Sequence, residues 1–213
     1  MDRPRRSALA IVREYVGLAI VAVVLAFLIR TFLGLAFYIP SASMYPTLKI
    51  NDRVVVSRLS YRLHDPHRGD IIVFDNPNIV TKEPSLPVRT VRHMLEVVGI
   101  QHDKDKNLIK RLIGLPGDTL EGKAGHVYIN GKLLIEPYLQ PSVTTTDFGP
   151  LKIPKGRYWM MGDNRGNSED SRYWTCPAER PQSEPVFCQT ITESAMVGRA
   201  VVRVWPPWRG AFL

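Results

Sequence analysis

Two serines lie in a short segment that combines small residues with prolines. Residues 39–48 read IPSASMYPTL, so Ser41 and Ser43 stand between Pro40 and Pro46. Proline fixes its own φ and stiffens the chain, so this loop can present a hydroxyl in one orientation. A serine hydroxyl becomes a nucleophile when a base lies beside it. On its own the segment is a weak signal, since Ser/Pro loops usually only connect elements.

Lys110 is a candidate for that base. It lies in the segment 108–114, LIKRLIG, and strand alternation places it on one face with Leu108 and Leu112. Apolar neighbours desolvate an ammonium group and lower its pKa, and a neutral lysine amine is a usable general base. The alternative, which is the commoner outcome for a strand lysine, is that the ammonium reaches solvent.

A third stretch, 161–174, reads MGDNRGNSEDSRYW and is dense in charged and hydrogen-bonding residues. Asp163, Asp170, Arg165 and Arg172 can form ion pairs that make this a rigid loop. The calcium-loop pattern D-x-[DN]-x-[DN]-G is not met, because residue 165 is Arg.

The histidines do not form a recognisable site. His64 and His67 give an H-x-x-H pair, but no acidic or cysteine ligands accompany them, so we interpret them as part of a solvated loop. No serine lies in a G-x-S-x-G elbow. We therefore expect no metal and no cofactor. A Ser-His-Asp triad stays open at this point, because its members can be distant in sequence.

The elements that must position these residues are mostly strands. The segments 53–59, 70–74, 108–114, 126–130 and 200–205 are rich in β-branched and aromatic residues. Asn130-Gly131 predicts a two-residue hairpin, and Pro116-Gly117 predicts a type II turn. Seventeen prolines argue against long helices. The sequence predicts a mainly β domain.

A long apolar block precedes this domain. Residues 15–29 carry no charge, and apolar character continues past Arg30. A spanning helix needs about 20 mostly apolar residues, and the arginines ahead of the block favour a cytoplasmic N-terminus. We expect a cytoplasmic segment 1–14, a single-pass transmembrane anchor 15–35 and an extracytoplasmic domain 36–213. The alternative is a cleaved secretory signal peptide, with Ser-Ala-Ser at 41–43 as its small-residue site.

The net charge of +8 allows nucleic acid or an anionic membrane surface as a partner. No basic run with interleaved aromatics is present, so we expect a lipid bilayer and no nucleic acid. Two tryptophans in the segment 205–213 would suit a membrane interface. Cys176 and Cys188 can close a disulfide loop in an oxidising compartment, worth roughly 3 kcal/mol. The alternative is two unpaired thiols.

Together the three polar stretches resemble the type I (leader) signal peptidases, membrane-anchored proteases that remove signal peptides with a serine and a lysine. The family's nucleophile box P-S-x-S-M-x-P-T-L is matched by 40–48, its lysine box K-R-x-x-G-x-P-G-D by 110–118, and its third box G-D-N-R-x-N-S-x-D-S-R by 162–172. Residues 69–74 and 197–205 also fit. Because cleavage after Ser43 would separate the nucleophile from the domain, the resemblance favours a retained anchor in the plasma or inner membrane.

The resemblance implies a signal-peptidase-like coiled antiparallel β-sheet or barrel domain, with a small cap insertion at about 119–157. Ser43 would be the nucleophile, Lys110 its general base, and the Ser41 hydroxyl with the Ser43 N–H would form the oxyanion hole. Ser168 would orient Lys110 through a hydrogen bond. The supporting loop residues would be Asp163, Asp170 and Arg172.

The resemblance also implies the substrates, signal-peptide-bearing preproteins with small residues at −1 and −3 of the cleavage site. The preprotein would bind as an extended strand against the edge that carries Ile109. Shallow apolar pockets would be lined by Phe37, Ile39, Pro40, Met44, Leu48, Leu108 and Ile109. We expect the enzyme to be a monomer.

Two positions depart from the family pattern: Gly166 replaces an Asp and Thr175 replaces a Gly. Neither is a catalytic position. The competing hypotheses are a dedicated Ser-Lys peptidase for one pilus or secretion component, an autoproteolytic repressor-like switch, and a non-enzymatic, membrane-anchored β-rich binding module. A repressor would need a DNA-binding domain, and no helix-turn-helix candidate precedes the catalytic region. In a binding module Lys110 would be solvated, with an ordinary pKa.

Overall fold

The structure, a computed structural model, describes residues 12–22, 35–57, 59–77, 107–176 and 185–213. Residues 12–22 are helical. Across these ranges, no helix combines the length and the apolar character needed to cross a bilayer. Of the anchor expected at 15–35, residues 23–34 lie outside the described residues.

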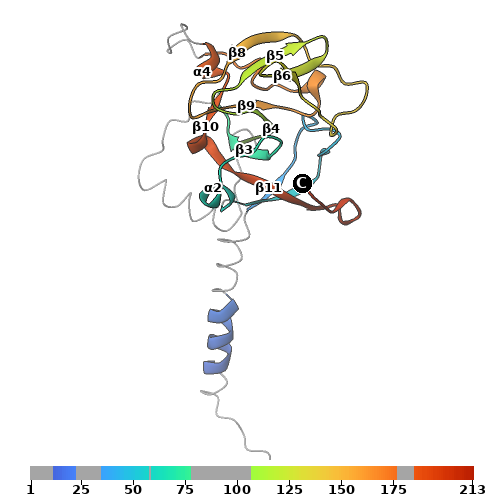
Figure 1. Ribbon diagram of the computed structural model, residues 1–213. Coiled ribbons are helices and arrows are strands. Elements are labelled where there is room, and N and C mark those ends of the chain that lie inside the picture. Colours follow the sequence, from blue (N-terminus) through green and yellow to red (C-terminus); the bar gives the residue numbers. More distant parts are fainter. Residues whose placement is uncertain (1–11, 23–34, 58, 78–106, 177–184) are drawn as a thin grey trace, which may run out of the picture.

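The larger sheet contains eight antiparallel strands in the order β1-β2-β11-β3-β4-β9-β10, with β12 beside β11 (Figure 1). The described strands of this path end at β1 and at β10, so they do not close into the barrel that was one of the expected forms. The mainly β prediction is confirmed. The strands are β1 (Leu35–Tyr38), β2 (Arg53–Ser57), β3 (Ile71–Asp75), β4 (Asn107–Gly114), β9 (Arg157–Met161), β10 (Ile191–Thr192), β11 (Met196–Trp205) and β12 (Ala211–Phe212).

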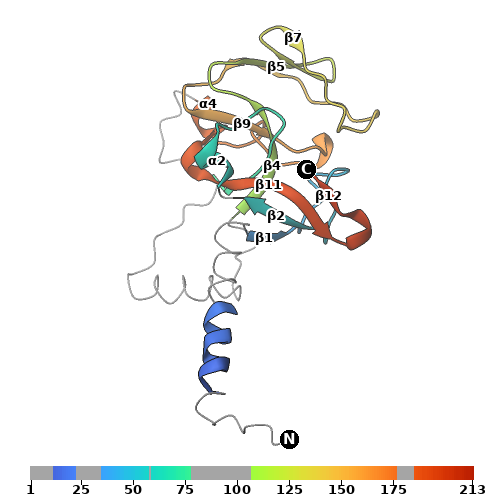
Figure 2. The ribbon, with the colours of Figure 1, turned by 60° about the horizontal axis from the view of Figure 1, so that its bottom comes forward.

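The smaller sheet has the order β7-β6-β5-β8 and lies at one end of the larger sheet (Figures 1 and 2). It is built from β5 (Thr119–Lys123), β6 (His126–Ile129), β7 (Lys132–Leu133) and β8 (Phe148–Lys152). The hairpin predicted at Asn130-Gly131 joins β6 to β7, and both residues have positive φ (52° and 76°), as a type I′ turn requires. The turn at 115–118 has Gly117 at φ 88°, which only a residue without a Cβ adopts easily.

The helical pieces of the domain are short. They are α2 (Ser60–Leu63), η1 (Arg165–Asn167), α4 (Pro185–Cys188), η2 (Glu193–Ala195) and η3 (Pro207–Arg209). The apolar core divides into three clusters, and β4 contributes to each of them through Ile109, Leu112 and Ile113. This central strand is therefore buried on both faces from residue 109 onward.

Strand pairing brings the three polar stretches together. The segment 39–52 connects β1 to β2, which are neighbours at one end of the larger sheet (Figure 2). Lys110 lies on β4 directly opposite Ile72 of β3. On its other side β4 pairs with β9, and the polar stretch 162–172 begins where β9 ends. Elements far apart in sequence thus meet around the middle of β4.

Candidate active site

Ser43 and Lys110 are in direct contact. Lys110 Nζ lies 2.8 Å from Ser43 Oγ, within hydrogen-bond distance. Both residues are buried, with 7% and 3% of their surfaces exposed. One side chain comes from the β1–β2 connection and the other from β4, so only the folded chain assembles the pair.

The surroundings of Lys110 favour its neutral form. Ile72 lies opposite it on β3, and Leu112 follows it on the same face of β4; both are buried. Burial lowers the pKa of Lys110 from 10.5 to about 8, and the nearby carboxylates of Asp170 and Glu169 oppose that shift. The desolvation expected from strand alternation is confirmed. A lysine with this pKa has a substantial neutral fraction near neutral pH, as a general base requires.

The turn that carries Ser43 is held by a residue that the sequence analysis did not single out. The backbone N–H of Asn164 donates to the Ser43 carbonyl at 3.0 Å, and Asn164 Nδ2 donates to the Ala42 carbonyl at 3.0 Å. Ser41 is exposed, and its Oγ lies 3.3 Å from Ser43 Oγ. Asn164 fixes the backbone from which both hydroxyls project.

Asp163 pairs with β4 and not with a neighbour in its own loop. Arg111 Nε and Nη2 donate to its two carboxylate oxygens at 2.8 and 2.7 Å. Thr47 Oγ1 donates to Asp163 Oδ2 at 2.6 Å. This buried ion pair links the residue after Lys110 to the serine segment and to the polar loop. Adjacency to Lys110 was the one available sequence signal for the role of Arg111.

Asp170 and Arg172 pair with each other, through Nε–Oδ1 at 2.8 Å and Nη2–Oδ2 at 2.9 Å. Asp170 Oδ2 also accepts the Gly162 N–H at 2.9 Å, which closes the loop on itself. The expectation of ion pairs in this stretch is met here, although Asp163 and Arg165 find their partners outside it.

Ser168 does not make the hydrogen bond to Lys110 that the resemblance implies. Its buried Oγ has no hydrogen-bond partner in this structure. The hydroxyl faces Gly162, where an added Cβ would lie only 2.2 Å from it. The Ser168 side chain is packed against Gly162, and the contact recorded for the Lys110 amine is with Ser43 Oγ.

The residues expected to line substrate pockets fall into two groups. Ile39, Met44, Leu48 and Ile109 belong to one buried cluster beneath the serine segment. Phe37 packs against that cluster, Leu108 is half-buried and Pro40 is exposed. The buried members are at most 9% exposed and are packed into the core of the domain. Pairing with β9 begins only at Arg111, so no residue of β9 pairs with 107–110.

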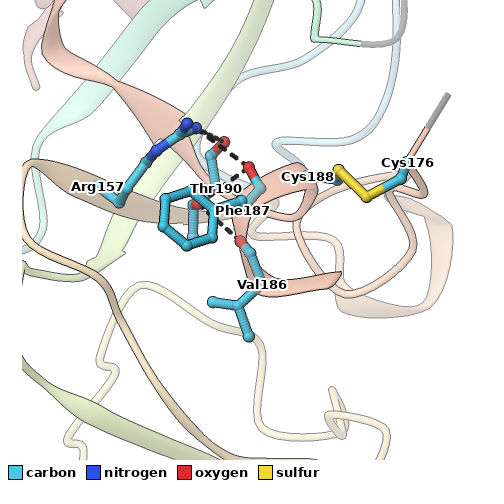
Figure 3. The surroundings of a disulfide bond; sticks show 6 residues. All are labelled: Arg157, Cys176, Val186, Phe187, Cys188 and Thr190. Carbon is cyan, nitrogen blue, oxygen red and sulfur yellow. Dashed lines mark hydrogen bonds between the residues drawn. A yellow bond between two sulfur atoms is a disulfide. The ribbon is translucent and has the colours of Figure 1, made fainter. Parts of the chain in front are cut away.

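Cys176 and Cys188 are joined by a disulfide (Figure 3). Cys176 follows the polar loop by four residues, and Cys188 ends α4. Arg157 of β9 donates to the carbonyls of Phe187 and Thr190 at 3.1 and 3.3 Å. The residues between the cysteines include 177–184, which lie outside the described ranges.

The residues around Ser43 indicate a class of protein. His64 and His67 are exposed on the connection between α2 and β3, and His126 begins β6. The titratable group beside the Ser43 hydroxyl is the buried amine of Lys110. A mainly β domain with this serine–lysine pair has the arrangement of a serine hydrolase whose base is an amine.

Comparison with known proteins agrees with this class. Residues 12–205 match the family model described as signal peptidase, peptidase S26. A probable signal peptidase I-2 from Synechocystis is 43% identical over 187 residues, covering 88% of this chain and 70% of that protein. Signal peptidase I of Mycobacterium tuberculosis is 36% identical over 230 residues, covering 98% and 77%. A crystal structure of signal peptidase I from Enterococcus faecalis is 26% identical, covers 65% of this chain and 98% of its own, and has a TM-score of 0.42.

The chain therefore belongs to the signal peptidase family, peptidase S26, and is a serine endopeptidase of that family.

Proposed function

We propose that this chain removes N-terminal signal peptides from exported preproteins, with Ser43 as nucleophile and Lys110 as general base. The observation that carries the proposal is the 2.8 Å contact between Ser43 Oγ and a lysine amine whose pKa is lowered to about 8. At that pKa a fraction of the amine is neutral near neutral pH and can accept the hydroxyl proton.

The reaction follows from this geometry. Neutral Lys110 takes the proton of the Ser43 hydroxyl as Oγ attacks the scissile carbonyl. The oxyanion is stabilised by the Ser41 hydroxyl and the Ser43 N–H; loss of one such donor typically lowers kcat by about 10²–10³. The lysine ammonium then protonates the departing amine, and the signal peptide stays on Ser43 as an ester. Lys110 next activates a water that hydrolyses this ester.

The substrate strand is proposed to lie along residues 107–110 of β4, the part of the strand that does not pair with β9. Backbone hydrogen bonds to an added strand give affinity, and side-chain pockets give specificity. The neighbouring core cluster of Ile39, Met44, Leu48 and Ile109 is apolar, and we propose that substrate side chains pack against its outer surface. A shallow apolar site of this kind suits small side chains at −1 and −3.

We further propose that residues 15–35 anchor the chain in the membrane, with 1–14 cytoplasmic and the β domain outside. The turn between β11 and β12 supports a second bilayer contact, because Trp208 and Phe212 are largely exposed there and Trp205 is half-exposed. Tryptophan is enriched at membrane interfaces. Ser43 follows the anchor closely, which suits a substrate whose signal helix lies in the bilayer. Both members of the dyad come from one chain, so a monomer suffices.

The test is cleavage of a purified preprotein by the full chain in lipid vesicles. Ser43→Ala and Lys110→Met are expected to lose cleavage, because each removes one member of the dyad. Ser194→Ala, an exposed serine on η2, is the matched control and keeps activity. Full activity in either dyad variant would refute the proposed roles.

A further inference from the structure

A buried ion pair joins the smaller sheet to the loop that holds the nucleophile. Arg165 of η1 is 1% exposed. Its Nη1 donates to Glu136 Oε2 at 3.1 Å and to Thr145 Oγ1 at 2.6 Å, while Nη2 donates to Glu136 Oε1. Glu136 and Thr145 both lie on the connection from β7 to β8. The Tyr138 hydroxyl donates to Glu136 at 2.5 Å, so the carboxylate is itself fixed.

The same arginine fixes the loop from the inside. Arg165 Nε donates to the Gly162 carbonyl at 3.1 Å, and the Arg165 carbonyl accepts Arg172 Nη2 at 2.8 Å. These two hydrogen bonds fix the backbone before and after Asn164, the residue that precedes Arg165. It is this asparagine that donates to the carbonyls of Ala42 and Ser43.

The contact between the loop and the nucleophile turn has little room for adjustment. A Cβ added at Gly162 would lie 2.5 Å from the Ser43 carbonyl oxygen. A small displacement of the loop would therefore act directly on the Ser43 turn, whereas the backbone of Lys110 is also held by the pairing of β4 with β3. Displacements of about 1 Å at reacting groups can lower a rate by about 10²-fold.

We propose that Glu136 and Arg165 are positioning residues, through which the smaller sheet sets the orientation of the Ser43 turn. The inference rests on the proposed function, because it concerns the rate at which Ser43 attacks a preprotein. Under this proposal the smaller sheet affects the rate of the reaction, although it contributes no residue to the serine–lysine pair.

If Glu136 and Arg165 only stabilised the fold, the catalytic rate of their variants would follow the stability. Removing one partner of a buried pair leaves an uncompensated charge, whereas replacing both partners by apolar residues often restores stability. The apolar pair cannot restore the directed hydrogen bond to the Gly162 carbonyl. In the double variant Glu136→Leu/Arg165→Met, stability should therefore recover while the catalytic rate stays low.

The experiment compares wild type, Glu136→Gln, the double variant and Arg68→Met in the vesicle assay, with Tm measured for each. Arg68→Met is the control, because it removes another ion pair, from the α2–β3 connection to Asp118 on the β4–β5 turn, together with a hydrogen bond to the Ile113 carbonyl; neither contact involves the Gly162 loop. We expect kcat to fall about 10- to 100-fold in Glu136→Gln and in the double variant, with KM within about twofold. The double variant should melt above Glu136→Gln, and Arg68→Met should keep its kcat.

Recovery of kcat in step with Tm in the double variant would overturn the proposal. If the double variant does not fold, Thr145→Val decides, because it removes one hydrogen bond to Arg165 and no charge. A lower kcat at unchanged Tm supports the positioning role, and an unchanged kcat overturns it. If wild type and Ser43→Ala do not differ in cleavage, the proposed function fails. If they differ while the positioning variants match wild type, only this inference fails.

Discussion

The pH dependence of cleavage is the most direct consequence of the buried lysine. With a pKa of about 8, Lys110 is neutral in about one tenth of the molecules at pH 7 and about nine tenths at pH 9. The rate at low substrate concentration should therefore rise about tenfold between these values and then level off. A lysine at the ordinary pKa of 10.5 would instead give a rise of about 100-fold with no plateau.

One substitution tests the electrostatic reasoning without touching the dyad. The Glu169 carboxylate favours the charged form of Lys110 and so raises its pKa, and its side chain is exposed. Glu169→Gln removes that charge and should lower the pKa of Lys110. The rising limb of the profile then moves to lower pH, and cleavage at pH 7 becomes faster.

The assay is kcat/KM for a peptide substrate between pH 6 and 10, at low and at moderate salt. Glu193→Gln is the control, because Glu193 is equally exposed and does not appear among the groups that act on Lys110. A limb that stays in place or moves to higher pH in Glu169→Gln would refute the reasoning. A wild-type profile that still climbs tenfold per unit at pH 9 would show that Lys110 is not the desolvated base.

Three further results follow from the buried charges and the disulfide. Lys110 is protonated in both the folded and the unfolded chain below pH 8, but between pH 8 and 10.5 the unfolded chain binds more protons, so stability rises with pH across that window. Lys110→Met should accordingly increase the free energy of unfolding at pH 7 by up to about 3 kcal/mol, measured by urea denaturation, and the gain should vanish by pH 10.5. Asp163→Asn leaves Arg111 without its buried carboxylate and should lower stability by about 3–5 kcal/mol in the same measurement; a loss below 1 kcal/mol would contradict the pairing. Replacing Cys176 and Cys188 by serine opens a loop with a sequence separation of 12 and should cost about 3 kcal/mol, detected as a lower urea midpoint with an unchanged pH profile.

Local chemistry made part of this fold predictable. The Asn130-Gly131 hairpin follows from two residues that tolerate positive φ. Alternation along a strand with apolar neighbours allowed Lys110 to be buried without requiring it, and the structure buries it. These features depend on residues close together in the sequence, so the sequence alone was sufficient to suggest them.

Long-range pairing could not be read in the same way. The position of β11 between β2 and β3 depends on strands distant in sequence. The partners Arg111–Asp163 and Arg165–Glu136 depend on that topology, since nothing local to Arg165 points to residue 136. The resemblance also implied a hydrogen bond between Ser168 and Lys110. In the structure the Ser168 hydroxyl has no partner, and the Lys110 amine contacts the Ser43 hydroxyl. Side-chain direction at this scale is decided by packing.

The pairing of β11 with β2 determines when the Ser43 segment can reach its folded position during synthesis. The strand that borders the Ser43 segment, β2, completes its ladder only with residues 199–205 of β11, which are synthesised after β3, β4 and β9. Asp52, just beyond that segment, is held by Arg209, which emerges later still. Loop closure over such a separation is slow compared with local structure formation. The Ser43 segment therefore reaches its final packing only after β11 has been synthesised.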